Sequence, residues 1–102
     1  MVTLIYCFDL DETLCETVGM DYAKSKPLLS RIAMVNSLYR SGNTIKIHTA
    51  RGSKTGIDWR PLTESQLVEW GVSYHELHMG KPFADLYIDD KAVNTSDFFL
   101  NC

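Results

Sequence analysis

The sequence is poor in cysteine and contains no long hydrophobic run, and these two absences exclude several classes of protein. Its three cysteines are odd in number and form no C-x-x-C pair, so neither a disulfide framework nor a zinc knuckle is indicated. No segment approaches the ~20 apolar residues of a membrane span, and the opening residues lack the basic start of a signal peptide. We therefore expect a cytoplasmic protein with reduced thiols and no membrane partner.

Basic residues are also few and scattered. The chain has 10 Lys and Arg residues against 13 Asp and Glu, so it lacks the clustered positive charge of a nucleic-acid surface. Its 102 residues are 45% hydrophobic and 23% charged, as in an ordinary globular protein, and they include no repeat or low-complexity tract. We expect a single domain over residues 1–102 with no nucleic-acid partner.

Hydrophobic patterning predicts a chain of alternating strands and helices. Residues 2–8 are apolar on both faces apart from Thr3, which predicts a central strand covered by helices on either side. A capping-box spacing at Thr63 and Gln66 predicts the start of the second helix. The predicted order is strand, helix, strand, helix, strand, strand, over residues 2–8, 27–40, 44–49, 63–70, 72–79 and 86–90. This order predicts an α/β fold with a mostly parallel sheet and flanking helices.

Charged and hydroxyl side chains follow the predicted strands at the point where each one ends. In open α/β sheets, ligands bind beyond the carboxyl ends of the strands, so we expect these side chains to converge. Carboxylates gathered without compensation would be destabilising, and a magnesium ion with oxygen ligands would remove the conflict, whereas nothing at the predicted site favours zinc. The residues concerned are Asp9, Asp11, Thr49, Lys81, Asp89 and Asp90.

The types of these side chains point to phosphoryl transfer. A carboxylate at Asp9, next to a metal and a cation, is placed to attack phosphorus and form an aspartyl phosphate. Asp11, two residues further on, is placed to protonate the leaving oxygen and then to activate water. Thr49 and Lys81 offer a hydroxyl and a cation to the phosphoryl oxygens.

The loop after the strand of residues 44–49 supplies candidates for substrate recognition. The guanidinium of Arg51 suits phosphate or carboxylate, although a surface role is an equally good interpretation. Asp58 and Arg60 are weaker candidates for contacts with substrate hydroxyls.

The motifs that carry these residues resemble those of a known family, the phosphatases of the haloacid dehalogenase (HAD) superfamily. "DLDET" is similar to the first motif of that superfamily, "IHTAR" to the second, "GKP" to the third and "YIDD" to the fourth, in the same order over residues 9–90. The stretches "TARGS", "LTESQLVEWGV" and "GKPFADLYIDDKA" resemble its small capless members from capsule and surface-polysaccharide loci. The resemblance implies a minimal HAD-like (Rossmann-like) fold and hydrolysis of a sugar or polyol phosphate.

The resemblance also implies a role for each motif residue. It gives Asp9, Asp11, Thr49 and Lys81 the roles described above. It further implies that Asp9, the main-chain carbonyl of Asp11 and Asp90 hold Mg²⁺, with Asp89 bound directly or through water.

Two features depart from the family pattern. No stretch is long enough for a cap domain, so selectivity must come from loops or from a neighbouring subunit in a homo-oligomer. In addition, only "GKPFAD" separates the third and fourth predicted strands, whereas a parallel crossover usually needs a dozen residues or more. The topology of residues 79–86 is therefore open.

Two other functions remain as alternatives. A catalytically weak binding or regulatory module would keep the fold and depend on a partner. Unpaired acidic and basic side chains without a catalytic role would, however, be costly to keep. A signalling receiver domain also uses Asp, Thr, Lys and magnesium, but it places them in a different order along the chain. We expect an enzyme acting on a small phosphorylated metabolite.

Overall fold

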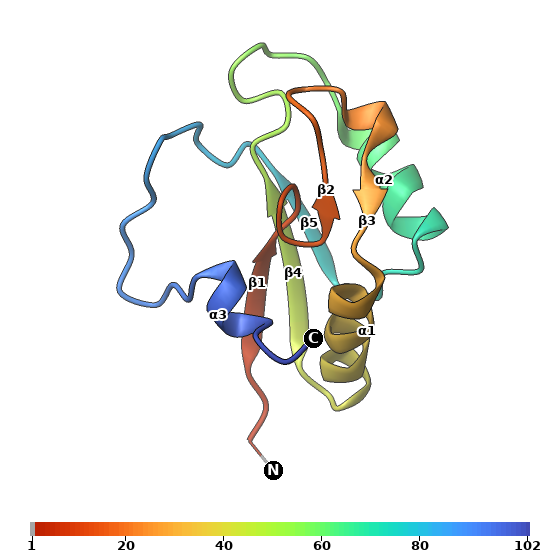
Figure 1. The fold of residues 1–102 in the computed structure, drawn as a ribbon, viewed down its shortest axis with the longest axis vertical. Helices are drawn as coiled ribbons and strands as arrows, with labels where there is room; N and C mark the ends of the chain where they lie inside the picture. Colours follow the sequence, from red (N-terminus) through yellow and green to blue (C-terminus); the bar gives the residue numbers. More distant parts are fainter. Residues whose placement is uncertain (1) are drawn as a thin grey trace.

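The computed structural model describes residues 2–102 and contains a small α/β fold (Figure 1). A three-stranded parallel sheet is flanked by helices, and a short two-stranded sheet lies beside it. The elements, in chain order, are β1 (Ile5–Asp9), β2 (Cys15–Glu16), the 3₁₀ turn η1 (Tyr22–Lys24), β3 (Lys26–Pro27), α1 (Leu29–Arg40), β4 (Thr44–Thr49), α2 (Arg60–Glu69), β5 (Glu76–Met79) and α3 (Thr95–Phe98). The predicted α/β class is confirmed.

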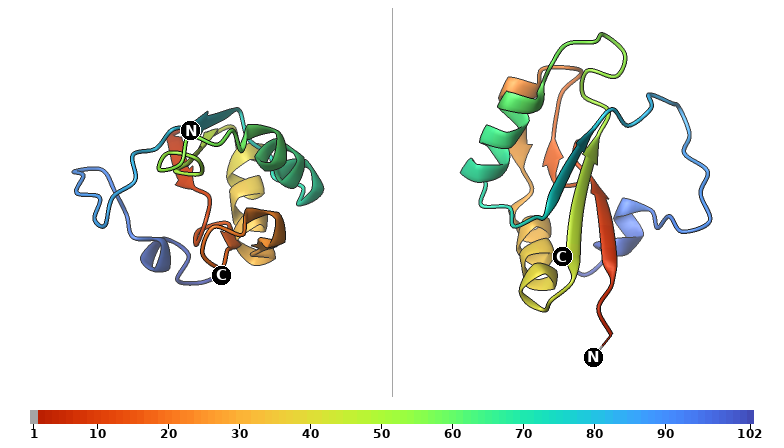
Figure 2. Two further views of the ribbon diagram at one scale, coloured as in Figure 1. Left: turned by 90° about the horizontal axis from the view of Figure 1, so that it is seen from above. Right: turned by 180° about the vertical axis from the view of Figure 1, so that it is seen from behind.

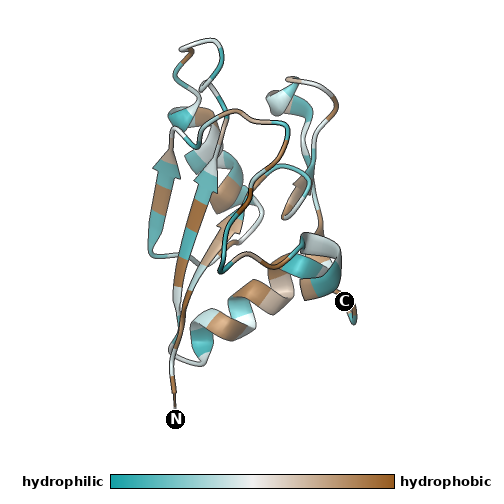
Figure 3. Cartoon of the chain, turned by 90° about the vertical axis from the view of Figure 1, so that its left-hand side faces the viewer, coloured by the Kyte–Doolittle hydropathy of each residue, from teal (hydrophilic) through white to brown (hydrophobic). Residues whose placement is uncertain are grey.

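The central strand of the main sheet is β4. It pairs in parallel with β1, with Phe8 opposite Ile47, and with β5, with Leu77 opposite Ile47. Buried and partly exposed residues alternate along β4, and Figure 3 shows the alternation of apolar and polar residues along the strands. The buried residues Ile45 and Ile47 face the core, which also receives Ile32 and Val35 from α1.

The prediction that residues 2–8 form a central strand covered on both faces is wrong. In the described part of the chain, β1 lies at an edge of the sheet (Figure 1). The helices lie on one side of the sheet (Figure 2), where Phe8 is buried. On the other face Ile5 is 70% exposed and Cys7 is also exposed. An apolar run of this kind is read as buried because the pattern alone does not show which face a helix will cover.

The first helix is close to its prediction. Ile32 and Val35 bury one side of α1 against the sheet. Gly42, with a φ of 95°, turns the chain after the helix, a conformation that glycine adopts without strain. The helix begins at Leu29 rather than at Pro27, because Pro27 pairs with Cys15 in the hairpin of β2 and β3.

The capping-box prediction is wrong. The second helix, α2, begins at Arg60, with Pro61 in its first turn, where a missing N–H costs nothing. Thr63 and Gln66 therefore lie inside the helix, on its buried face. Their polar atoms contact Arg51, a residue distant in sequence, rather than the end of their own helix.

The last two predicted strands are corrected in different ways. The strand predicted over residues 72–79 is shorter, since only Glu76–Met79 pairs with β4. The strand predicted over residues 86–90 is absent, and this stretch belongs to an open segment between β5 and α3 (Figure 1). Leu86 is 78% and Ile88 95% exposed. The short connection from β5 explains why no regular crossover forms.

Two further features complete the fold. The short helix α3 is capped by the side chain of Asn94, which accepts a hydrogen bond from the Ser96 N–H, and its Phe98 ring packs edge-on against Tyr6 and Phe8 of β1. Within residues 2–102, no helix is both long enough and apolar enough to span a membrane.

Candidate active site

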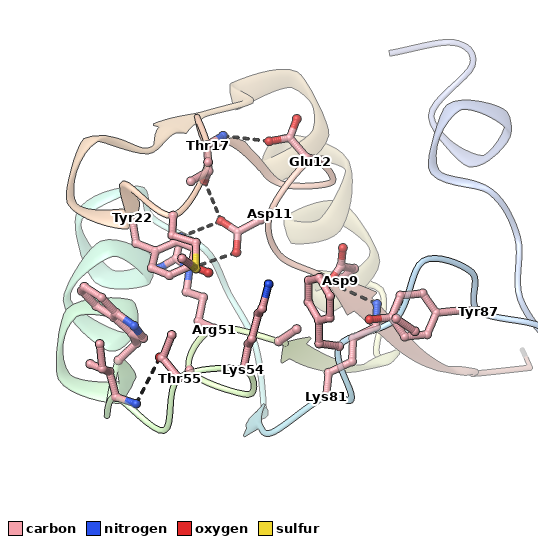
Figure 4. Close-up of a pocket in the computed structure, with 18 residues that line it drawn as sticks. Asp9, Asp11, Glu12, Thr17, Tyr22, Arg51, Lys54, Thr55, Lys81 and Tyr87 are labelled. Atoms are coloured by element: carbon pink, nitrogen blue, oxygen red, sulfur yellow. Dashed lines mark hydrogen bonds and ion pairs between the residues drawn. The ribbon is translucent and has the colours of Figure 1, made fainter.

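A pocket of about 650 Å³ opens at the carboxyl ends of the three parallel strands. Asp9 is the last residue of β1, Arg51 lies just after β4, and Lys81 lies just after β5. The β1–β4–β5 pairing brings these segments together, although they are far apart in the sequence. Of the predicted site residues, the pocket lining includes Asp9, Asp11, Arg51 and Lys81 (Figure 4). Of the side chains predicted to converge at the strand ends, Asp9, Asp11 and Lys81 do so in this pocket.

Asp9 and Lys81 form an ion pair at one side of the pocket. The Lys81 ammonium lies 3.3 Å from a carboxylate oxygen of Asp9, and both side chains are partly exposed. The main chain holds Lys81 in place, because its N–H donates to the Thr49 carbonyl and its carbonyl accepts from the Ser53 hydroxyl. The ring of Tyr87 lies under the ammonium, 4.0 Å from the nitrogen. This part of the pocket therefore combines an accessible carboxylate with an anchored cation.

The Asp11 carboxylate is bound by the guanidinium of Arg51. Arg51 Nε donates to Asp11 Oδ2 at 3.0 Å, and Arg51 Nη2 donates to Asp11 Oδ1 at 2.9 Å, which is the two-pronged geometry of a strong guanidinium–carboxylate pair. The hydroxyl of Thr17 also donates to Oδ1, at 2.6 Å. The next residue, Glu12, has a φ of 64°, which is rare for a side chain other than glycine and turns the loop sharply. Arg51 and Thr17 thus hold the Asp11 side chain, and the turn at Glu12 shapes the loop that carries it.

The structure gives Arg51 neither of the roles considered from the sequence. Its side chain is fully buried, and every nitrogen of the guanidinium donates to a protein acceptor. The ring of Tyr22 lies 4.7 Å from the guanidinium carbon. With its donors occupied, Arg51 is placed to support Asp11 rather than to bind substrate or face solvent.

Lys54 is a pocket residue that the sequence analysis missed. Its side chain points into the space between Asp9 and Asp11 (Figure 4), and its ammonium lies 5.0 Å from the centre of the Phe83 ring. Among residues 2–102 it has no carboxylate within ion-pair distance. Its position in a glycine-bounded loop after a strand was the available signal. Thr17, Tyr22 and Tyr87 also line the pocket and were not predicted from the sequence.

Five predicted site residues lie outside the pocket lining: Asp89 and Asp90, described below, and Thr49, Asp58 and Arg60. Thr49 is buried, and its hydroxyl accepts a hydrogen bond from the Arg51 N–H. Asp58 accepts a hydrogen bond from the main chain of Arg60 just before α2. The Arg60 guanidinium donates to the Leu77 carbonyl on β5. In this arrangement Asp58 and Arg60 contact the main chain outside the pocket rather than a substrate.

The carboxylates predicted to share a magnesium ion are only partly gathered. Asp9 and Asp11 line the pocket, whereas Asp89 and Asp90 lie in the exposed segment after β5 and are absent from the lining. The Asp89 carboxylate accepts a hydrogen bond from the Lys91 N–H, which lowers the pKa of Asp89, and the neighbouring Asp90 lowers it further. In the described chain no three His, Cys, Asp or Glu side chains cluster closely enough to hold a metal. The Asp9 carboxylate offers the oxygen that Mg²⁺ prefers, but the full ligand set does not fit as arranged.

Two neighbouring groups are kept uncharged. Burial, reinforced by the charge of Asp11, raises the pKa of the Cys15 thiol to about 12. Burial also lowers the pKa of His48, and the adjacent Lys81 ammonium lowers it further. The His48 imidazole is therefore neutral at pH 7, and Cys15 stays a thiol.

The comparisons with known proteins identify a relative without assigning an activity. No protein-family model matches the chain, and no curated protein matches it significantly. The chain is similar to a protein from Vibrio cholerae whose crystal structure is described only as that of an MCSG target. The two chains are 32% identical, the match covers 94% of this chain and 87% of the other, and the TM-score is 0.84. The chain therefore belongs to the same family as this Vibrio cholerae protein.

Proposed function

We propose that the protein is a magnesium-dependent phosphomonoesterase of the small capless HAD type. In this proposal it hydrolyses a sugar or polyol phosphate in the cytoplasm, in capsule or surface-polysaccharide synthesis. The observation that carries the proposal is the pocket arrangement of Asp9 beside Lys81, with Asp11 two residues further on. A carboxylate nucleophile, a cation for the phosphoryl oxygens and a second carboxylate for proton transfer are the parts that this reaction needs.

The proposed reaction has two steps. In the first, an Asp9 carboxylate oxygen attacks phosphorus, the bond between phosphorus and the ester oxygen breaks, and Asp11 donates a proton to the departing oxygen. In the second, Asp11 takes a proton from water as the water oxygen bonds to phosphorus. The bond between phosphorus and Asp9 breaks, and inorganic phosphate leaves. Lys81 and Lys54 offset the negative charge of the phosphoryl oxygens throughout.

Magnesium belongs to the proposal through the sequence resemblance and the oxygen donor at Asp9. When bound, it would supply positive charge at the phosphoryl group. None of the proton transfers above depends on where it binds.

The walls of the pocket favour a compact organic phosphate. Tyr22 and Trp59 form an edge-to-face aromatic pair with ring centres 5.1 Å apart, and both residues line the pocket together with Ile57. Apolar and aromatic walls with a few charged groups are typical of sites for small molecules, and aromatic rings pack on the C–H faces of sugars.

The test is phosphate release from a panel of sugar, polyol, nucleotide and aryl phosphates, with magnesium or with a chelator. We expect magnesium-dependent release that falls by at least about 1,000-fold in Asp9→Asn, because the nucleophile is lost. Asp21→Asn is the matched control, since Asp21 is an exposed aspartate outside the pocket lining. If the folded native protein releases no phosphate from any compound, the proposal is wrong and the binding or regulatory module is favoured.

A further inference from the structure

We propose that Arg51 is a positioning residue that fixes the Asp11 carboxylate for proton transfer, an inference that rests on the proposed phosphatase function. The two-pronged contact between Arg51 and Asp11 engages both carboxylate oxygens at once. Such a contact fixes the plane of the carboxylate as well as its position. The Asp11 side chain nevertheless retains 23% exposure and lines the pocket, so it remains accessible to substrate.

The remaining donors of Arg51 are anchored in the protein interior. Arg51 Nη1 donates to Gln66 Oε1 at 2.6 Å and to Thr63 Oγ1 at 3.1 Å, and both partners lie on the buried face of α2. The guanidinium therefore has a fixed orientation of its own, set by a helix that does not otherwise contribute to proton transfer. Through Arg51, α2 positions the Asp11 carboxylate.

Residues next to the β2–β3 hairpin also support Arg51 and Asp11. Arg51 Nη2 approaches the Ser25 hydroxyl at 3.3 Å, and Thr17 contacts both Ser25 and Asp11 at 2.6 Å. Gln66 also donates to the Tyr22 carbonyl at 2.6 Å. Because these groups bond one another as well as Arg51, Asp11 lies at the end of a connected polar network rather than of a single ion pair.

This role predicts a dependence on the leaving group. A positioned acid contributes roughly 100- to 10,000-fold when the departing oxygen needs a proton. An alkyl phosphate has such a leaving group, whereas p-nitrophenolate leaves readily without one. The ratio kcat/KM reports the steps up to departure of the leaving group, so misplacing Asp11 should affect the two substrates unequally.

The experiment measures kcat/KM for the best alkyl phosphate of the panel and for p-nitrophenyl phosphate in native protein, Arg51→Lys and Asp11→Asn. Lysine keeps the charge but cannot form the two-pronged contact. We expect Arg51→Lys to lose about 100-fold on the alkyl phosphate and less than about 5-fold on p-nitrophenyl phosphate. Because both residues act through one group, adding Arg51→Lys to Asp11→Asn should cost little more than Asp11→Asn alone.

Arg31→Lys is the matched control. Like Arg51, Arg31 lies over an aromatic ring, and its guanidinium donates to the Thr13 carbonyl. It is outside the pocket lining, so its replacement should leave the ratio between the two substrates unchanged. An equal loss on both substrates in Arg51→Lys would overturn the inference while leaving the proposed function standing. Inactivity of the native protein on both substrates would instead refute the proposed function.

A second variant covers the case in which Arg51→Lys does not fold, as judged by circular dichroism. Gln66→Met removes one acceptor of Arg51 and leaves the contact with Asp11 in place. We expect kcat/KM for the alkyl phosphate to fall relative to kcat/KM for p-nitrophenyl phosphate, by about 3-fold or more, because the Arg51 guanidinium loses one of its anchors. A folded Gln66→Met protein with the native ratio would contradict the inference.

Discussion

Cys15 shows how strongly the surroundings of one side chain determine its reactivity. It is fully buried at the start of β2, and its sulfur lies 3.5 Å from a carboxylate oxygen of Asp11. Burial and that negative charge both disfavour the thiolate and raise the pKa of Cys15 to about 12. Since the thiolate is the reactive form, the Cys15 thiol next to the pocket is unreactive.

We therefore expect unequal alkylation of the three cysteines at pH 8. The thiolate fraction of Cys15 should be about 1,000-fold lower than that of an ordinary thiol, because its raised pKa keeps the proton bound until far higher pH. Cys102 is exposed and serves as the internal control. Mass spectrometry after a timed reaction with iodoacetamide measures the labelling. Labelling of Cys15 in the folded protein as fast as that of Cys102 would refute this expectation.

The sequence located single residues better than it explained them. Asp9, Asp11 and Lys81 were predicted to lie in one site because strand ends converge in a parallel sheet, and all three line the pocket. The function of Arg51 could not be predicted in this way, because its acceptors Thr63 and Gln66 come from a helix 12 and 15 residues further along the chain. Thr63 and Gln66 have the spacing of a helix capping box, and only the tertiary fold shows that they face Arg51.

The loop between β4 and α2 depends on two glycines with different surroundings. Gly52 has a φ of 83° and Gly56 a φ of 78°, so both adopt a conformation that other residues enter only with strain. A Cβ on Gly52 would overlap the Ile57 carbonyl oxygen, whereas a Cβ on Gly56 would meet open space. The loop that carries Lys54 therefore relies on Gly52 for space as well as for backbone conformation.

We expect the two alanine variants to separate these contributions. Gly56→Ala should lower the free energy of unfolding by about 1 kcal/mol, the cost of the left-handed backbone alone. Gly52→Ala should cost at least about 2 kcal/mol more, because the main chain must move to relieve the overlap. Urea unfolding followed by circular dichroism gives both values. Equal losses in the two variants would show that the overlap is relieved at no cost.

Whole elements were predicted with uneven success for a physical reason. The helix over residues 27–40 and the strand over 44–49 were recognised because their patterns reflect burial that the fold provides. The predicted strand over 86–90 has an equally apolar pattern, yet pairing needs a neighbour in register as well as apolar side chains. The connection after β5 does not bring that segment into a ladder, which a pattern within the segment cannot reveal.

Backbone hydrogen bonding is unevenly distributed over the molecule as a whole. The β4 strand pairs on both sides, whereas residues 82–93 make no hydrogen bond between main-chain groups in the structure. Their amides have no main-chain partner and no burial, since this segment lies almost wholly in solvent, and only the Lys91 N–H has a side-chain acceptor. The molecule thus combines a firmly bonded sheet with a loosely held segment that carries Asp89 and Asp90.

We expect hydrogen exchange to divide the chain along the same line. The amides of residues 82–93 should exchange within seconds at pH 7, while those of Ile45 and Ile47 should require opening of the sheet and exchange at least about 1,000-fold more slowly. Exchange read by mass spectrometry on peptides from the two regions tests this. Repeating it with magnesium and inorganic phosphate shows whether ligands order the segment. Slow exchange of 82–93 in the free protein would contradict the arrangement seen in the structure.

The parallel pairing of β1 with β4 also determines how the protein can fold. Leu4 and Asn43, which hydrogen bond where the pairing begins, are 39 residues apart in the chain, and none of the three strands of the main sheet is joined to the next by a hairpin. Every rung of that sheet therefore requires the closure of a long loop, which costs conformational entropy before any contact compensates. Asp9 lies on β1, which can pair with β4 only after this loop has closed. A partly synthesised chain that ends before residue 44 has no partner for β1, so it contains the aspartates of the pocket without the sheet that positions them.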